Sequence, residues 1–335
     1  MQKKVYAFVN KEKNDLLNSS SGGAFTAIYK ILKEYYGKCI VYGAVLNEKL
    51  DVVHIRAEEE KQVFEMRGSK YVQSSIAGIK EKLKKDIELE NPVLFTGTPC
   101  QIAAMKMFCH KNKLNLDKVF FLDIICHGTA SKEIWKKYIN WLEIKYKNKV
   151  TNFYFRYKGT RWKTYSTKII FSNKKELVNN YDGYIYNKLF LSSYFLNKGC
   201  FNCKFCTLNR NSDITIGDFW GIEKIIPDIS NFNGVSQVLV NSTKGEFIIE
   251  NLRLKGLLKI CNTEEYLKYQ HNLSAPTKMP KNINIFWKEL KILTFEEILI
   301  KYGKYSKFNK SIYLLKKILG ELGIINFIKK IKEKI

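Results

Sequence analysis

The strongest constraint on the fold is a pair of apolar runs that a helix-like segment separates. The runs PVLFTGTPC (92–100) and KVFFLDIICHG (118–128) lack the alternation of half-exposed strands, and the segments 101–111 and 130–146 have helical character. Strands that are apolar throughout are typical of parallel sheets covered by helices. The sequence therefore predicts an α/β fold with a mixed or parallel sheet core and helices on both faces, together with an antiparallel, cysteine-rich portion that holds a metal site.

Periodicity in the rest of the chain completes this outline. It predicts a loop that enters a helix over 18–38, a second helix over 244–254, hairpins over 40–59 and 152–171, and a strand over 235–242. Glycine follows the first of these helices at position 37 and is expected to end it.

Two cysteines directly follow the two apolar strands. Cys100 lies at the end of the first strand and Cys126 at the end of the second. The carboxyl ends of parallel strands share one edge of a sheet, and open α/β sheets bind their ligands at that edge. We therefore expect the two thiols to be neighbours in space. Cys100 also opens a helix, whose positive end favours a thiolate.

A compact C-x2-C-x2-C motif places three more thiols at Cys200, Cys203 and Cys206. Three thiolates with a remote fourth commonly hold a 4Fe–4S cluster, whereas zinc usually takes its ligands in two pairs. The chain has no second cysteine or histidine pair with that spacing. The spacing therefore favours a 4Fe–4S cluster over zinc, with Cys100 or Cys126 as the fourth ligand. The three remaining cysteines are expected to be ordinary core residues.

Three further segments allow both a functional and a purely structural interpretation. The loop SSSGG (19–23) precedes a helix, so its backbone N–H groups could bind a phosphate, but the same residues also form ordinary helix caps. The segments FRYKGTRW (155–162) and GDFWG (217–221) mix aromatic rings with charges. They are either core aromatics at strand ends or a flavin or substrate surface, in which Arg156 and Lys158 would bind an anion.

The formal net charge of +25 is compatible with a nucleic acid, an anionic membrane or an acidic protein as partner. It also fits a general compositional bias, because lysine and asparagine are abundant along the whole chain. The last segment, 309–335, places apolar residues near helical spacing among lysines. That pattern is typical of a helix at a membrane surface, although such a helix can equally pack on the domain or on a partner.

The expected cellular compartment follows from the N-terminal residues and from the length of the apolar stretches. The first residues are charged and lack the apolar stretch of a secretory signal, and no segment approaches the roughly 20 apolar residues of a membrane span. We therefore expect a cytoplasmic protein, in which clustered thiols serve as metal ligands or redox groups rather than as disulfides.

Six motifs occur in a fixed order, namely SSSGGAF, RGSKYVQS, FTGTPCQIAA, DIICHG, CFNCKFC and SDITIGDFWGI. In this order they resemble the coenzyme F420 hydrogenase/dehydrogenase beta-subunit family. The resemblance implies an iron–sulfur flavoprotein that binds FAD and a 4Fe–4S cluster and passes electrons to a small acceptor at the flavin. It assigns the cluster to Cys200, Cys203 and Cys206, and it matches Cys100 and Cys126 without deciding which of them is the fourth ligand.

The resemblance extends over about residues 5–255 and also implies candidate flavin residues. These are Ser20, Ser21, Gly22, Gly23, Ser69, Lys70, Tyr71 and Asp218. Arg156 and Lys158 remain candidate substrate ligands. We divide the chain into an N-terminal part with the flavin-site loops (1–90), a part with the iron–sulfur site (91–262) and a basic helical tail (263–335).

The chain departs from many relatives, which carry an additional N-terminal ferredoxin domain. We therefore expect at most one cluster here and an external, ferredoxin-like electron donor. A positive surface would suit an acidic ferredoxin. Short relatives of this kind resemble bacterial proteins associated with surface-polysaccharide synthesis, whose precursors are often lipid-linked. This suggests a role in that synthesis at the inner face of the membrane, although the family alone does not fix the substrate.

Three functional hypotheses fit these observations. The first is an oxidoreductase that passes electrons from an external donor through a 4Fe–4S cluster and FAD to a small organic substrate. The second is a non-catalytic electron-transfer subunit of a larger redox complex. The third is a zinc-stabilised nucleic-acid binder, which we disfavour because the second ligand pair is missing. No nucleic-acid partner is therefore expected.

Overall fold

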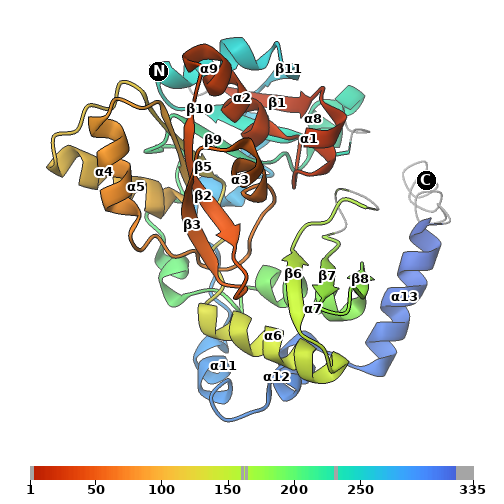
Figure 1. The fold of residues 1–335 in the computed structure, drawn as a ribbon. Coiled ribbons are helices and arrows are strands. Elements are labelled where there is room, and N and C mark those ends of the chain that lie inside the picture. The colour runs from red at the N-terminus through yellow and green to blue at the C-terminus, as the bar shows by residue number, and fades with distance from the viewer. Residues whose placement is uncertain (1–3, 160–161, 163–164, 230–232, 322–335) are drawn as a thin grey trace.

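The computed structural model of the protein describes residues 4–159, 162, 165–229 and 233–321. Within these residues, eight strands form one sheet at the centre of the molecule (Figure 1). The strands are Val5–Asn10 (β1), Ile40–Leu46 (β2), Val52–Ala57 (β3), Val93–Gly97 (β4), Val119–Ile124 (β5), Ile214–Asp218 (β9), Ser236–Val240 (β10) and Gly256–Cys261 (β11). Their order across the sheet is β11-β1-β10-β9-β5-β4-β2-β3.

The sheet is parallel at its centre and antiparallel at its edges. The strands β2, β4, β5 and β9 run parallel to their neighbours in this group. The hairpin of β2 and β3 closes one edge, and β10, β1 and β11 continue the other edge in antiparallel fashion. The predicted strand–helix–strand–helix unit is confirmed as β4, α5 (Pro99–Lys111), β5 and α6 (Lys132–Tyr146). The expected α/β fold with a mixed sheet is therefore confirmed.

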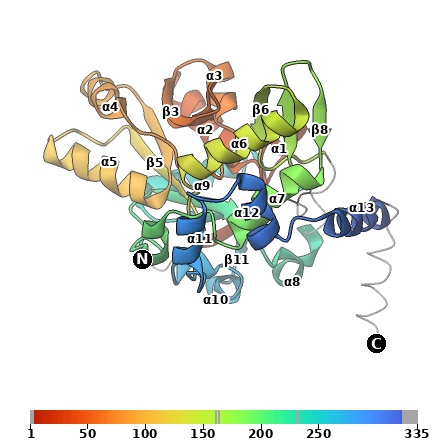
Figure 2. The ribbon, with the colours of Figure 1, turned by 90° about the horizontal axis from the view of Figure 1, so that it is seen from below.

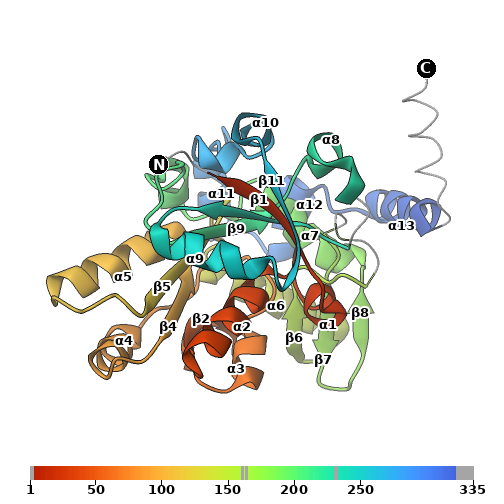
Figure 3. The ribbon, with the colours of Figure 1, turned by 90° about the horizontal axis from the view of Figure 1, so that it is seen from above.

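Helices cover both faces of this sheet because side chains alternate along each strand. On β4, Leu94 packs into the core beneath α2 and α9, whereas Val93 and Phe95 pack beneath α4 and α5. Figure 3 shows α2 and α9 side by side over the first face. The helices around the sheet are Lys13–Leu17 (α1), Ala24–Tyr36 (α2), Glu60–Glu65 (α3), Ile79–Glu88 (α4), Ile222–Ile225 (α8), Thr243–Leu252 (α9) and Thr263–Leu267 (α10).

A smaller antiparallel sheet lies beside the main sheet and has a core of its own. Its strands are Val150–Tyr154 (β6), Lys168–Phe171 (β7) and Glu176–Val178 (β8), and it packs with α6 and with Tyr181–Leu191 (α7), Ile283–Glu289 (α11) and Phe295–Gly303 (α12) (Figure 2). Aromatic rings fill this core, with Trp135 in contact with Phe153, Phe155 and Tyr186. The predicted hairpin over 152–171 is confirmed in its two strands, whereas residues 160–161 and 163–164 of its tip lie outside the described residues.

Local sequence signals set the ends of the helices that matter most for the site. Gly23 and Gly37 flank α2 with φ values of 83° and 75°, a conformation that glycine adopts without strain, so the predicted end of this helix is confirmed. Thr98 and Gln101 form a reciprocal capping box at the start of α5. These caps fix the two helix N-termini at the carboxyl edge of the parallel strands.

The last described helix projects from the body of the molecule. Helix α13 (Lys307–Glu321) extends away from the sheets in Figures 1 and 2 and confirms the predicted tail helix over its described part, whereas residues 322–335 lie outside it. No helix among the described residues is both long enough and apolar enough to span a bilayer. The division at residue 90 stays a prediction, and the main sheet contains strands from both sides of that position.

Candidate functional site

Five cysteine thiols gather at the carboxyl edge of the parallel strands. Burial raises the pKa of the Cys126 thiol, and the nearby Cys200, Cys100 and Cys203 raise it further. Burial also raises the pKa of Cys206 to about 12, with added contributions from Cys203 and Cys200. We call these five residues the thiol cluster. Cys100 and Cys126 are therefore neighbours, as the strand topology predicts, while their role as metal ligands stays a prediction.

Hydrogen-bond donors surround the thiol cluster. The Thr129 hydroxyl lies 3.9 Å from the Cys200 sulfur. The backbone of Gly128 opposes the rise in the pKa of the Cys126 thiol, and the backbone of Thr129 does the same for the pKa of Cys200. Among the described residues, no group of three or more Cys, His, Asp or Glu side chains is arranged so that it could hold a metal ion. A set of converging thiols with N–H and O–H donors nevertheless has the chemistry of a site for a thiophilic metal group, because such donors stabilise thiolate ligands.

A buried ion pair joins the two chain segments that carry these thiols. The side chains of Arg210 and Asp123 are 1% and 0% exposed, and their closest nitrogen and oxygen are 3.0 Å apart. Residues 198–206, which carry three of the thiols, form the segment that we call the cysteine loop. Arg210 also donates to the carbonyl of Phe205 in this loop, at 2.8 Å, and to that of Ile124 at the end of β5, at 2.9 Å. One guanidinium therefore fixes the cysteine loop to the strand that leads to Cys126.

This ion pair could not be predicted from the sequence. The available signal was a single acidic residue, Asp123, within the apolar run KVFFLDII. Burial raises the pKa of this carboxyl, and Arg210 opposes that rise. A carboxylate in a parallel strand needs a partner, but the sequence does not identify Arg210, which lies 87 positions away.

A cavity of about 450 Å³ opens at the same edge of the sheet. This volume is within the usual range for a small-molecule or cofactor site, roughly 300–1,000 Å³. Its lining includes most of the candidate flavin residues, namely Ser20, Ser21, Gly23, Ser69, Lys70, Tyr71 and Asp218. It also includes Cys126, which is the one member of the thiol cluster among the described lining residues. The cavity and the thiol cluster therefore share a wall.

The serine loop, residues 19–23, is anchored on three sides. The Ser69 N–H donates to the Ser20 hydroxyl at 2.7 Å, which ties the loop to the segment 66–72. The Ser21 hydroxyl donates to the carbonyl of Val235 at 2.7 Å, next to β10. Behind the loop, Gly22 packs so closely that a Cβ atom would stand 2.1 Å from the Phe8 carbonyl oxygen. Gly22 is absent from the described lining, and it lets the loop lie against β1.

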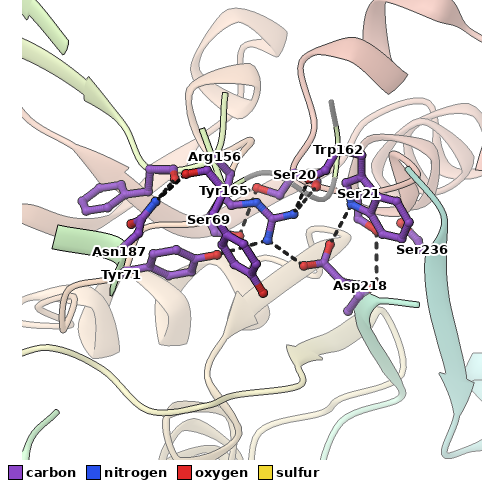
Figure 4. Close-up of polar contacts among 12 residues, drawn as sticks. Ser20, Ser21, Ser69, Tyr71, Arg156, Trp162, Tyr165, Asn187, Asp218 and Ser236 are labelled. Atoms are coloured by element: carbon purple, nitrogen blue, oxygen red, sulfur yellow. Dashed lines mark hydrogen bonds and ion pairs between the residues drawn. The ribbon is translucent and has the colours of Figure 1, made fainter. Parts of the chain in front are cut away.

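Arg156 supports the cavity wall from behind. It is buried, pairs with Asp218 at 2.8 Å and donates to the Tyr71 hydroxyl at 3.3 Å. Burial opposes its charge, but Asp218 and Tyr71 outweigh this effect and raise its pKa. Figure 4 shows the guanidinium between these two cavity residues.

Two lysines hold the loops around the cavity. Lys158 donates to the carbonyls of Leu16, at 2.7 Å, and Ser21. Burial lowers its pKa to about 7. Neither Lys158 nor Arg156 is among the described lining residues, so their role as substrate ligands stays a prediction. Lys70 does line the cavity, donates to the Met66 carbonyl at 2.9 Å, and has its pKa lowered to about 7 by burial.

Aromatic rings and a histidine complete the wall. Tyr71 stacks on Phe190 with ring centroids 4.4 Å apart, and Tyr165 stacks on Trp220 at 5.7 Å. His127, next to Cys126, also lines the cavity, and burial lowers its pKa. The motif DIICHG contains His127, but its sequence context predicted no role for this residue. The cavity thus offers flat apolar surfaces together with a few fixed polar groups, which is typical of cofactor sites.

Comparison with known proteins gives one family match. The sequence model of a family described as the C terminus of the coenzyme F420 hydrogenase/dehydrogenase beta subunit matches residues 90–266, which is more than half of the chain and contains the whole thiol cluster. Among solved structures, the chain is similar to a chain of the F420-reducing NiFe hydrogenase complex from Methanosarcina barkeri. The two are 14% identical with a TM-score of 0.49, over 90% of this chain and 93% of that chain. No curated protein matches the chain.

Proposed function

Because this chain belongs to the coenzyme F420 hydrogenase/dehydrogenase beta-subunit family, we propose that it is an iron–sulfur flavoprotein oxidoreductase. In this proposal it takes electrons from an external donor and delivers them to a small organic substrate. The observation that carries the proposal is that Cys126 belongs both to the thiol cluster and to the cavity wall. A metal group held by the thiols and a ligand in the cavity would then be in direct contact with the same residue.

The thiol cluster would hold a 4Fe–4S cluster through Cys200, Cys203, Cys206 and Cys126. Burial disfavours the charged form of the Cys126 thiol, and a bound metal would compensate that charge, whereas Cys100 is exposed and hydrated. We therefore favour Cys126 over Cys100 as the fourth ligand. When bound, the cluster supplies one-electron transfer and FAD supplies hydride transfer to an organic molecule.

The chain's own residues would position the flavin. The serine loop and the N-terminus of α2, whose residues Gly23, Ala24 and Phe25 line the cavity, offer backbone N–H groups and a positive dipole end to the pyrophosphate. Arg156 would act through Asp218 and Tyr71, whose positions it fixes, and Lys158 would act through the serine loop. In this proposal both cations shape the site without direct contact to the cavity ligand.

The electron donor we propose is an acidic, ferredoxin-like protein. The cysteine loop exposes Lys198 and Lys204, and no acidic residue occurs between positions 193 and 212. Complementary charge would bring such a donor to the thiol cluster and raise the rate of encounter. The rate of electron transfer should therefore fall as the salt concentration rises.

We also propose, from the surface of helix α13, that the protein is cytoplasmic and contacts the inner face of the membrane. Tyr313 packs on Tyr184 with ring centroids 4.8 Å apart, so the helix is held on one side. On another side Phe308, Leu315 and Ile318 are 73%, 56% and 53% exposed. Exposed apolar residues among lysines suit an anionic lipid surface. Such a location would suit a lipid-linked substrate of surface-polysaccharide synthesis, which is the substrate class we propose.

Electron transfer in cysteine variants tests the proposed function. The protein is purified without oxygen, and reduction of its flavin by reduced ferredoxin is followed by absorbance. We expect rapid reduction in the wild type, and loss of both iron and rapid reduction in Cys126→Ser. Cys109→Ser serves as the matched control, because Cys109 is a buried thiol of α5 outside the cluster. If Cys126→Ser keeps its iron and Cys100→Ser loses it, Cys100 is the fourth ligand.

The same preparation separates the oxidoreductase from the electron-transfer subunit. An oxidoreductase oxidises its reduced flavin when a suitable small acceptor is added. An electron-transfer subunit does so only when a partner protein is present. Rapid ferredoxin-dependent reduction that is identical in the wild type and in all cysteine variants would refute the proposed use of the thiol cluster.

A further inference from the structure

Tyr165 is an aromatic residue of the cavity wall that the fold holds in an unusual backbone conformation. Its φ angle is 50°, in the left-handed region that residues with a side chain rarely adopt. The Asn187 side chain donates to the Tyr165 carbonyl at 3.0 Å and to the Phe155 carbonyl at 2.9 Å, which ties the two segments together. Such conformations persist only where the surrounding structure imposes them, and they are concentrated at functional sites.

Neighbouring side chains fix the ring of Tyr165 as well. The central carbon of the Arg156 guanidinium lies 4.3 Å from the centroid of the ring, and Figure 4 shows the two groups side by side. The Trp220 ring is nearly parallel to the Tyr165 ring, with the planes inclined by 17°. Because the phenol is already held in one orientation, a ligand that binds to it loses little affinity in ordering its side chain.

The hydroxyl of Tyr165 is accessible and is not used within the described part of the protein. It has no hydrogen-bond partner there, yet it does not belong to the fully buried polar atoms that lack a partner, so a ligand can reach it. Burial raises the pKa of this hydroxyl, and so do the nearby Tyr71 and Asp218, which line the cavity together with Tyr165. The hydroxyl therefore keeps its proton near neutral pH. It is a free donor in the wall of a ligand-sized cavity.

We propose that the Tyr165 hydroxyl donates a hydrogen bond to the FAD that binds in the cavity. This inference rests on the proposed function and adds a residue that holds the cofactor. FAD offers oxygen acceptors in two places, namely on the flavin ring with its ribityl chain and on the pyrophosphate. Both present the same chemistry to a phenol O–H group, and the test below distinguishes them.

The test is a flavin titration of the full-length protein after its flavin has been removed by dialysis against bromide. Tyr165→Phe removes only the hydroxyl, and we expect it to bind FAD about fivefold more weakly, as followed by FAD fluorescence. Its melting temperature without flavin should equal that of the wild type, because the hydroxyl has no partner among the described residues. Tyr35→Phe is the matched control, since Tyr35 is 63% exposed on α2 outside the described lining of the cavity, and we expect wild-type affinity.

Riboflavin, which lacks the pyrophosphate, locates the acceptor. If the acceptor is on the flavin ring or its ribityl chain, Tyr165→Phe weakens riboflavin and FAD by the same factor. If the acceptor is on the pyrophosphate, the wild type and Tyr165→Phe bind riboflavin equally. Equal binding of FAD by the two proteins would overturn the inference, as would a lower melting temperature of flavin-free Tyr165→Phe. A wild-type protein that binds no flavin would instead overturn the proposed function, and this inference with it.

Discussion

Replacing Arg210 by methionine should damage both the stability of the protein and its metal site. The change removes the partner of Asp123, whose side chain is 0% exposed, and it removes the donors to the carbonyls of Phe205 and Ile124. Breaking a buried ion pair by deleting one partner typically costs about 3–5 kcal/mol. Burial already raises the pKa of Asp123, so protonation of this carboxyl should relieve part of the cost. We therefore expect a loss of about 3 kcal/mol in the free energy of unfolding.

Two measurements separate the contributions of the pair. Urea denaturation gives the free energy of unfolding, and iron analysis gives the metal bound per chain. Replacing both partners, in Asp123→Leu with Arg210→Met, should restore most of the stability, because apolar substitutes for a buried pair are often neutral. The double variant should still bind less iron than the wild type, since nothing then ties the cysteine loop to the end of β5.

Arg253→Met provides the matched control, because Arg253 is an exposed residue after α9 and its loss should change stability by less than about 0.5 kcal/mol. If the free energy of unfolding of Arg210→Met is within about 1 kcal/mol of the wild-type value and the variant keeps its full iron content, the proposed role of the ion pair is wrong.

The structure makes three further predictions. Burial lowers the pKa of His54 in the folded protein, so below the ordinary value of about 6.5 the unfolded state binds more protons and stability falls as the pH falls. His54→Gln should therefore show a shallower loss of stability in urea denaturation from about pH 6.5 downward. Gly22→Ala should lower the melting temperature and weaken FAD binding. The reason is that the new Cβ would stand 2.1 Å from the Phe8 carbonyl oxygen and displace the serine loop. An unchanged melting curve would contradict this prediction. Leu315→Glu combined with Ile318→Glu should abolish co-sedimentation with anionic vesicles, whereas equal binding of the wild type to neutral vesicles would argue against the proposed membrane contact.

The sequence predicted the features that depend on local patterns and on strand topology. Two apolar runs with a helix between them specify parallel strands, and this alone brings Cys100 and Cys126 to one edge of the sheet. The end of α2 at Gly37 followed from a single glycine in the same way. In each case the relevant information lies within a short window of the sequence.

Features that depend on distant pairing could not be predicted in this way. Arg156 and Lys158 looked like anion ligands because they lie among aromatic residues, but their partners come from other parts of the chain. Asp218 forms an ion pair with Arg156, and carbonyls around the serine loop accept hydrogen bonds from Lys158. Charge and composition indicate such groups, but only the folded chain shows which of them remain for a ligand.

Cofactor analysis of the protein purified without oxygen tests the central claim most directly. Iron, acid-labile sulfide, zinc and flavin are measured per chain on the same sample. An iron–sulfur flavoprotein of this kind should contain about four iron and four sulfide with one FAD per chain, and it should have a brown colour that reduction bleaches. A colourless protein with one zinc per chain and no flavin would contradict it.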